Sequence, residues 1–292
     1  MKILFVVNPS SGRKRGVDWE KEIQNYFNGA SHDVKLLKLE KDVNVRTEIA
    51  SFKPDRVAAV GGDGTVTMLA QALGGTNLPM GILPAGSANG MAKELNIPDK
   101  PADALNVLVN ETPKALDAIR INDRDICLHL SDLGLNAQLI KYFEAGSLRG
   151  MVGYAKGIFK VMRNKQRIKV NVETPNEEAL RTAVMVAIAN ASKYGTGAVI
   201  NEQGKPNDGV FEVVVVRKLG IAEMLAAVIE RKRFNPKNVE VLPARSVSIE
   251  TERGVHFQID GEYKGKVTSV KAKILPAFVQ VIYPTEVAKP TT

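Results

Sequence analysis

The first third of the chain alternates short apolar runs with longer segments in which apolar residues recur every three or four positions. Short apolar runs predict buried strands, and the three- and four-residue spacing predicts helices. The predicted elements are strands at 2–8, 33–39, 57–60 and 80–83 and helices at 17–27, 45–52, 66–73, 91–95 and 101–110. This alternation is typical of a doubly wound parallel sheet.

From about residue 116 the pattern changes to runs rich in Val and Ile, which favour strands. These strands are predicted at 116–121, 125–130, 167–173, 182–190, 210–217, 245–250, 255–259, 267–274 and 278–283. Tight turns are expected at Asn122-Asp123 and Arg253-Gly254, and helices at 147–163 and 221–231. Strands joined by short turns predict an antiparallel β domain of sandwich or barrel type.

Two domains are therefore expected. An α/β domain covers 1–120 and a β-rich domain covers 121–283, with a tail at about 284–292 that is free to return to the first domain. Because no repeat or low-complexity linker separates the two, we expect them to pack closely around a cleft.

Three loops of small residues follow predicted strands of the α/β domain, at 8–12, 61–65 and 86–89. Glycines let backbone N–H groups approach a ligand closely, and the start of a following helix suits a phosphate. The carboxyl ends of parallel strands share one edge of the sheet, so the three loops together predict a phosphate site. Asp63 would repel a bare phosphate and therefore favours a Mg-nucleotide. The alternative is an ordinary strand-to-helix turn with an aspartate cap.

The composition is that of a globular protein, with 44% apolar and 25% charged residues and no apolar run long enough to cross a bilayer. A single cysteine, Cys127, excludes an internal disulfide, and we expect an inert buried thiol. The three histidines lack metal-ligand spacing, which argues against structural zinc. The net charge of +8 indicates attraction to polyanions without naming one.

The segment between residues 145 and 172 contains seven basic residues and no acidic one. Its helical spacing gives an apolar face of Met151, Tyr154, Ile158 and Met162 and a basic face of Lys156, Lys160 and Arg163. A basic amphipathic helix can lie on an anionic membrane. The alternative is a helix packed on the β domain with its basic face in solvent.

Five motifs stand in the order found in the diacylglycerol kinase catalytic family, which includes bacterial lipid kinases and the sphingosine and ceramide kinases. They are Asn8-Pro9-Ser10-Ser11-Gly12, Gly61-Gly62-Asp63-Gly64-Thr65, Gly86-Ser87-Ala88-Asn89, Asn207-Asp208-Gly209 and Asp260-Gly261-Glu262. Gly-Gly-Asp-Gly-Thr is shared with NAD kinases and phosphofructokinase-like enzymes, whereas the late Asp-Gly-Glu is more specific. The chain resembles this family over most of its length.

The resemblance implies an ATP site formed by Asn8, Pro9, Ser10, Ser11, Gly12, Gly61, Gly62, Asp63, Gly64, Thr65, Ser87 and Asn89. It implies that Asp208 binds Mg²⁺ together with the carbonyl groups of Lys205 and Val210. Asp63 and Asp117 would join that metal network through water. Asp260 would be the general base, with Glu262 beside it.

The chemistry of these residues agrees with the resemblance, because Mg²⁺ prefers oxygen ligands and an attacking hydroxyl needs a nearby base. Without the other motifs, Asp208-Gly209 and Asp260-Gly261 would be ordinary turn sequences. The chain departs from the common family pattern at Thr67, Met68, Gly90 and Asn207.

We therefore expect a peripheral lipid kinase that uses Mg-ATP to phosphorylate diacylglycerol or a related lipid. It would act in the cytoplasm, at the inner face of an anionic membrane. The alternatives are an NAD kinase-like enzyme and a lipid- or nucleotide-binding regulator without catalysis. No nucleic-acid partner is expected, because no recognised binding motif is present. A homodimer is left open.

Overall fold

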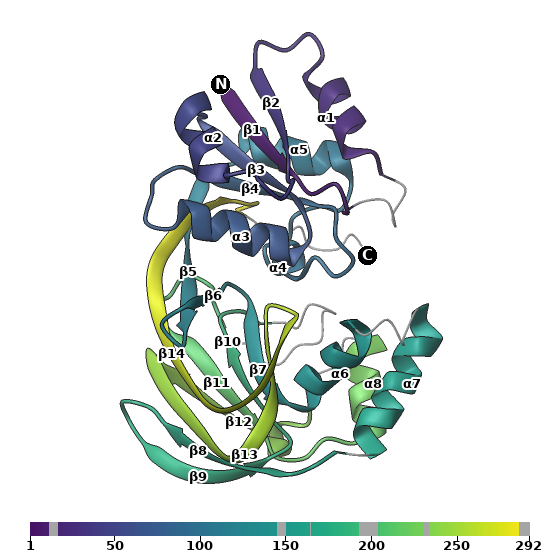
Figure 1. Ribbon diagram of the computed structural model, residues 1–292, viewed down its shortest axis with the longest axis vertical. Coiled ribbons are helices and arrows are strands. Elements are labelled where there is room, and N and C mark those ends of the chain that lie inside the picture. Colours follow the sequence, from purple (N-terminus) through teal and green to yellow (C-terminus); the bar gives the residue numbers. More distant parts are fainter. Residues whose placement is uncertain (12–16, 145–149, 164, 193–203, 230–233, 286–292) are drawn as a thin grey trace. The chain divides into compact units, whose positions relative to one another are not determined.

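A computed structural model describes residues 1–11, 17–144, 150–163, 165–192, 204–229 and 234–285 (Figure 1). The chain forms two compact units: unit 1 is Met1–Leu116 with Ala277–Thr292, and unit 2 is Asp117–Pro276. The sequence placed the boundary near residue 120 and the return of the chain at about residue 284. The division falls inside two long strands, β5 (Pro113–Ile121) and β14 (Glu262–Ile282), so no change of composition marks it.

Unit 1 contains a parallel sheet in the order β2-β1-β3-β4, which confirms the predicted α/β fold (Figure 1). Helix α1 packs against α5, and α2 packs against α3. Its elements are β1 (Lys2–Val7), α1 (Trp19–Phe27), β2 (Asp33–Lys38), α2 (Val45–Phe52), β3 (Arg56–Gly61), α3 (Asp63–Leu73), β4 (Met80–Pro84), α4 (Gly90–Glu94) and α5 (Pro101–Asn110).

The last residues of β14 belong to unit 1. Val281 pairs in parallel with Met80 of β4, and Gly75 N–H donates to the Phe278 carbonyl at 2.9 Å. A side chain on Gly74 would collide with the Phe278 ring, so glycine is what allows this close contact. Residues 277–282 thus complete a unit that otherwise consists of the first 116 residues.

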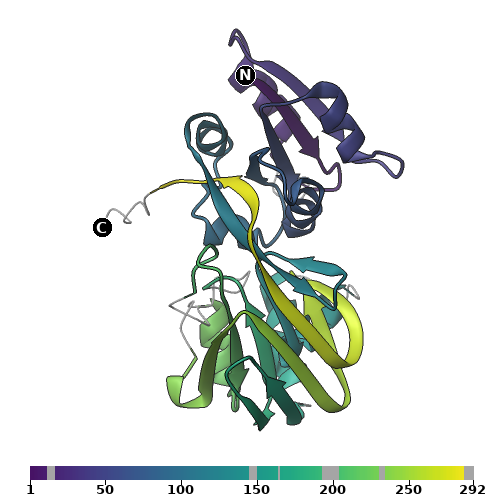
Figure 2. The same ribbon diagram turned by 90° about the vertical axis from the view of Figure 1, so that its left-hand side faces the viewer.

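Unit 2 is antiparallel and β-rich, as predicted (Figure 2). Its central strands run β12-β11-β10-β7-β13-β14, while β8 and β9 extend from β13, and β5 and β6 extend from β14. Besides β5 and β14, its elements are β6 (Asp125–Cys127), β7 (Leu130–Gly134), α6 (Leu135–Glu144), α7 (Gly150–Arg163), β8 (Ile168–Glu173), β9 (Glu178–Ala183), β10 (Met185–Ala189), β11 (Phe211–Val216), α8 (Ile221–Ile229), a 3₁₀ turn (Pro236–Asn238), β12 (Val239–Ala244) and β13 (Ser246–Ile259).

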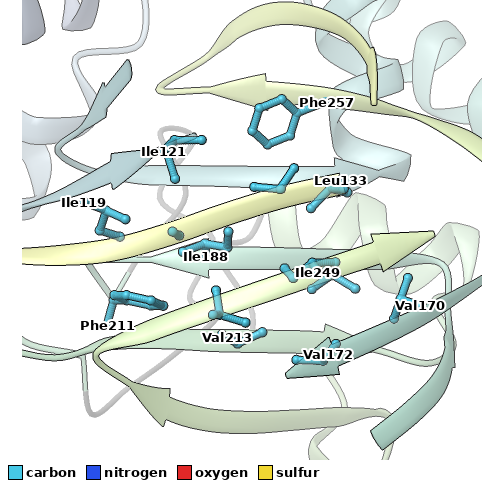
Figure 3. Close-up of a cluster of buried hydrophobic side chains, with 14 of the residues drawn as sticks. Ile119, Ile121, Leu133, Val170, Val172, Ile188, Phe211, Val213, Ile249 and Phe257 are labelled. Carbon is cyan, nitrogen blue, oxygen red and sulfur yellow. The ribbon is translucent and has the colours of Figure 1, made fainter. Parts of the chain in front are cut away.

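Both faces of the central strands are buried. In β10, Ile188 lies in the core formed between strands (Figure 3), as does Val186. Met185 and Ala187 lie in a second core under the helices. Successive side chains of a strand point to opposite faces. A strand covered on both faces therefore reads as a continuous apolar run, which is what the sequence shows here.

Several predicted elements of unit 2 are corrected by the structure. Strands β7, β9 and β12 and helix α6 were not predicted as separate elements. The Asn122-Asp123 turn is confirmed, with positive φ at both residues. Arg253-Gly254 was predicted as a turn between two strands, but β13 is continuous there and its pairing with β14 shifts register between Glu250 and Val255. Residues 251–254 stand there opposite residue 268 of β14 alone, an irregular bulge that interrupts the pairing without ending the strand.

Candidate active-site elements in each unit

The loops that follow β1 and β3 are joined side chain to side chain. Asn8 Nδ2 donates to Thr65 Oγ1 at 3.2 Å, and Asn8 N–H donates to the Val60 carbonyl at 3.0 Å. Because β1 is flanked by β2 on one side and β3 on the other, this junction lies at the switch in strand order. Ligands of open α/β sheets bind at that point. Asn8 also accepts hydrogen bonds from the Ser10 N–H and hydroxyl.

The loop after β4 packs directly on the loop after β3. A Cβ atom on Gly86 would stand 2.4 Å from Gly62 Cα, so the two backbones touch where neither residue has a side chain. Asp63 ties the same loops together, because its carboxylate oxygens accept the N–H groups of Gly90 (3.0 Å) and Met91 (3.1 Å). Asp63 is therefore a capping residue, although of α4 and not of the helix it begins, and its role toward a Mg-nucleotide stays a prediction.

Asn89 has a polar atom suited to a ligand. Its φ of 52° is left-handed, its Oδ1 accepts the Gly86 N–H at 2.8 Å, and its Nδ2 is buried without a partner among the described residues. Buried polar groups usually have a hydrogen-bond partner, so a ligand can still supply one to this donor. This donor fits a phosphate oxygen, which supports the predicted ATP site.

A pocket of about 420 Å³ lies beside the loop after β1, lined by Asn8, Pro9 and Ser11 together with Trp19 of α1 and Lys38 of β2. Gly61 is buried, and Gly64 and Ser87 are exposed on the other two loops. Gly12 lies outside the described residues. Unit 1 thus brings the described members of the predicted ATP site onto three interlocked loops.

In unit 2, Asp260 and Gly261 form the two-residue turn between β13 and β14. Both have positive φ (47° and 86°), and Ile259 pairs with Glu262 across the turn. This is the geometry of a type I′ hairpin, for which Asp-Gly is a favoured sequence. The backbone of Asp260 thus forms the hairpin turn that was the alternative interpretation of Asp-Gly. Its side chain makes further contacts outside the turn.

The Asp260 carboxylate is held by four donors from one segment. Oδ2 accepts the Leu128 N–H at 2.9 Å, and Oδ1 accepts the N–H groups of His129 and Leu130, each at 3.0 Å. The Cys127 thiol also donates to Oδ1 at 3.2 Å. Burial, and then the Asp260 charge, raise the pKa of Cys127 well above its usual value, so the thiol stays a donor. Cys127 is buried, as expected, and its thiol also helps to hold the Asp260 carboxylate.

A buried polar network lies behind the Asp260 turn. Gln258 Oε1 accepts the Gly261 N–H at 2.8 Å, Gln258 Nε2 donates to Asp132 Oδ2 at 2.5 Å, and Ser131 Oγ donates to the Gln258 carbonyl at 2.8 Å. Burial raises the pKa of Asp132 to about 6, opposed by hydrogen bonds from Asn136 and Gln258. The network holds the turn in place through the Gly261 N–H, and polar residues within strands are its only signal in the sequence.

Asp117 holds the loop that carries Asp208. Asp117 Oδ2 accepts the Gly209 N–H at 2.7 Å, and the Asp117 N–H donates to the Pro206 carbonyl at 2.8 Å. Asp208 is exposed, and its Oδ1 accepts the Val210 N–H at 3.2 Å. The structure thus brings Asp117 beside the predicted metal loop, in which Lys205 is also exposed.

The donors in this loop are chemically suited to Mg²⁺. An exposed carboxylate and neighbouring carbonyl oxygens are the ligands that this hard ion prefers. The described residues contain no group of three or more His, Cys, Asp or Glu side chains that could hold a metal. A site here would therefore depend on carbonyl oxygens and water. Asp63 belongs to the other unit, and its role in the same metal network stays a prediction.

Asn190 connects the two predicted sites of unit 2. Its Nδ2 donates to the carbonyls of Asp117 (2.9 Å) and Leu128 (3.0 Å), and its N–H donates to the His129 carbonyl (3.0 Å). The Asp117 loop and the segment that binds Asp260 are thus cross-linked by one buried amide. Asn190 is not among the predicted site residues; its signal in the sequence is a single amide that directly follows an apolar strand.

Glu262 is exposed at the start of β14 and forms an ion pair with Lys264 at 2.9 Å. On α7, Ile158 and Met162 are buried in the core under the helices, while Lys160 and Arg163 are exposed. The side chains of Met151, Tyr154 and Lys156 lie outside the described residues. The alternative of a helix packed on the β domain therefore holds for the described part of α7. None of the described helices combines the length and apolar composition that spanning a membrane requires.

Comparison with known proteins identifies the family. The model of the diacylglycerol kinase catalytic domain matches residues 2–121, and that of the YegS C-terminal NAD kinase beta sandwich-like domain matches residues 132–283. A Chromohalobacter salexigens protein named "probable lipid kinase YegS-like" is 30% identical over 71% of this chain and 69% of its own. A Staphylococcus saprophyticus diacylglycerol kinase is 24% identical over 90% of this chain and 89% of its own.

A crystal structure of a diacylglycerol kinase from Bacillus anthracis has the same fold, with a TM-score of 0.72 at 21% identity and 97% of each chain covered. The two domain models together account for both units of the structure, in the order that the fold requires. The chain belongs to the diacylglycerol kinase catalytic domain family.

Proposed function

We propose that the protein transfers the γ-phosphoryl group of ATP to a hydroxyl group of diacylglycerol or a closely related lipid. The observation that carries this proposal is the junction of three loops at the switch point of unit 1, in a chain whose relatives are named as lipid kinases. A kinase catalytic domain implies ATP as the phosphoryl donor. The unpartnered Asn89 amide supports phosphate binding at these loops.

Phosphoryl transfer depends mainly on positioning and on neutralising phosphate charge. The lipid hydroxyl oxygen forms a bond to the γ-phosphorus while its proton passes to the Asp260 carboxylate. The bond between that phosphorus and the bridging oxygen breaks, and ADP leaves. The amides of residues 128–130 and the Cys127 thiol keep the Asp260 carboxylate in one place. A fixed base of this kind typically contributes about 10²–10⁴ in rate.

Mg²⁺ would be held by the Asp208 carboxylate and by carbonyl oxygens of Lys205 and Val210, and when bound it neutralises phosphate charge. Asp117 supports this by fixing the loop through the Gly209 N–H. Asp63 is proposed to reach the same network through water.

The proposal is tested with ATP labelled at the γ-phosphate, offered together with a total lipid extract or with NAD. We expect Mg²⁺-dependent label in a lipid of phosphatidic-acid type and none in the nucleotide fraction. Label in NADP would favour the NAD kinase-like alternative, since unit 2 also matches a sandwich of NAD kinase type. ATP binding without transfer to either acceptor would favour a regulator.

We also propose that the protein works from the cytoplasm at the surface of an anionic membrane, through the basic face of α7. Lys160 and Arg163 are exposed there, and Phe159, which directly precedes Lys160, is 56% exposed, although large apolar side chains are usually buried. The apolar face of α7, with Ile158 and Met162, is buried in the core under the helices. Membrane contact would therefore use these three side chains.

Reversing both charges, with Lys160→Glu and Arg163→Glu, is expected to weaken binding to anionic vesicles. Each basic residue near the membrane contributes about 1 kcal/mol, so partitioning should fall roughly thirtyfold or more. Liposome sedimentation measures this. The matched control is Lys271→Glu with Lys273→Glu, which reverses two exposed charges on β14. Equal loss in both variants would show a general charge effect and would reject α7 as the contact.

A further inference from the structure

A second pocket, which lies in unit 2, has no role in the proposed reaction. It has a volume of about 220 Å³ and lies where the bulge of β13 faces the start of α6 and the beginning of β8. Its polar lining includes Gln138, Gln166, Arg253, His256 and Lys266. A water molecule occupies about 30 Å³ in the liquid, so the pocket has room for a much larger group.

The pocket is distinct from the Asp260 site. His256 precedes Asp260 by four residues on the same strand, which places it about 13 Å away along β13. The loops of the predicted ATP site are in unit 1 and contribute nothing to this lining. A ligand here would therefore occupy its own position on unit 2.

The polar lining is cationic. None of the residues that line the pocket is acidic, whereas Arg253, His256 and Lys266 are basic. No carboxylate in the described part of the chain forms an ion pair with Arg253 or Lys266. The nearest acidic neighbour in sequence, Glu252, pairs with Lys169 at 3.4 Å. The positive charge in the pocket is thus not neutralised by the protein.

The basic groups lie at and just beyond the bulge, where His256 pairs with Lys266 of β14. A bulge re-aims the side chains of the strand that carries it. Arg253 sits in the bulge, and its Nη2 donates to the Arg167 carbonyl at 3.1 Å, which fixes the guanidinium beside β8. The guanidinium group has five donors, so most of them remain for another partner.

His256 contributes a neutral donor. Burial, followed by the charges of Lys141 and Lys266, lowers its pKa, which favours the uncharged ring. Its Nδ1 lies 2.7 Å from the Tyr263 hydroxyl. When that hydroxyl donates to Nδ1, the other ring nitrogen carries the proton and can donate to an anion.

We propose that this pocket binds a phosphate-bearing group, through Arg253 and Lys266 as charged donors and His256, Gln138 and Gln166 as neutral ones. Arginine forks match phosphate oxygens in a bidentate way, and charge-assisted hydrogen bonds are the stronger kind. Either a soluble phosphate ester or the headgroup of an anionic lipid has this chemistry. The site is independent of the proposed lipid phosphorylation and would be present in a protein without that activity.

The test uses the full chain with a non-hydrolysable ATP analogue present, so that the loops of unit 1 are occupied. Calorimetric titrations use inorganic phosphate, sn-glycerol 3-phosphate, and vesicles of phosphatidylcholine with or without phosphatidic acid. The pocket variant is Arg253→Gln with Lys266→Gln. The single variant Lys266→Gln provides the same test if the double variant does not fold. The control, Lys271→Gln with Lys273→Gln, removes the same charge from exposed positions outside the pocket.

We expect the pocket variants to bind roughly tenfold or more weakly, while the control keeps wild-type affinity. Binding of the two soluble phosphates with this dependence identifies a phosphate ester as the ligand. Binding only of vesicles that contain phosphatidic acid, with the same dependence, identifies a lipid headgroup. If no probe binds, or if the pocket variants bind as the wild type does, the pocket is not a phosphate site.

Discussion

Asp260→Asn is expected to lower the rate of phosphoryl transfer by about 10²–10⁴-fold while ATP binding is unchanged. The asparagine side chain cannot take up the proton of the attacking hydroxyl. Its amide oxygen can replace Oδ1 opposite His129 and Leu130, but its NH₂ group would then face the Leu128 N–H. That contact adds a modest loss of stability, about 1–3 kcal/mol. Single-turnover kinetics and ATP titration separate the two effects.

The matched control is Asp123→Asn. Asp123 has the same side chain on a turn with nearly the same backbone, with a φ of 58° compared with 47° for Asp260, and it is exposed. It should keep wild-type turnover. A turnover of Asp260→Asn within a few-fold of the wild type would show that the general base is another group.

Gly86→Ala is expected to disrupt the loops of unit 1 and to abolish tight ATP binding. The new Cβ would stand 2.4 Å from Gly62 Cα and 2.8 Å from Asn89 Oδ1. Because the first neighbour is backbone, it cannot rotate away, and the two loops must separate. Overpacking of this kind costs about 1–3 kcal/mol or more. Thermal unfolding and ATP titration measure the two consequences.

Gly29→Ala is the control for this substitution. Gly29 has open space around it but a φ of +74°, so alanine there costs backbone strain without a collision. A stability loss of about 1 kcal/mol with unchanged ATP affinity is expected. Normal ATP affinity in Gly86→Ala would mean that the nucleotide does not use the contact between these loops.

Unit 1 was predictable because its signals are local. Helices α2 and α5 begin and end at the predicted residues, since Asn44 caps the first and a proline opens the second. The turn residues after β1, β3 and β4 then followed from the strands. What local signals could not show is that Asp63 caps a helix that begins 27 residues later.

The elements of unit 2 were harder to predict because the residues that determine them lie far apart in the sequence. Helix α6 was missed because its cap is Asp132, which lies inside β7 and accepts the Ala137 N–H at 2.9 Å. That position does not match the usual pattern of a capping residue just before a helix. Strand β12 was missed because only Ala244 of its six residues is buried, so its apolar pattern is weak.

The candidate site residues could be predicted from motifs, but their hydrogen-bond partners could not. Asp260 and Asp208 were found from motifs, but the amides that hold Asp260 come from residues about 130 positions earlier in the chain. Asn190 and Gln258 have no motif at all. Their roles arise only when β7, β10 and β13 are paired side by side.

The division of unit 1 into two segments has a consequence for biosynthesis. Domains generally fold one after another as a chain leaves the ribosome. Here the partner of Met80 on β4 is Val281, so translation must pass through all of unit 2 before the N-terminal unit receives its last strand. Until then the nascent chain carries an open β4 edge, and the first unit begun is the last one finished.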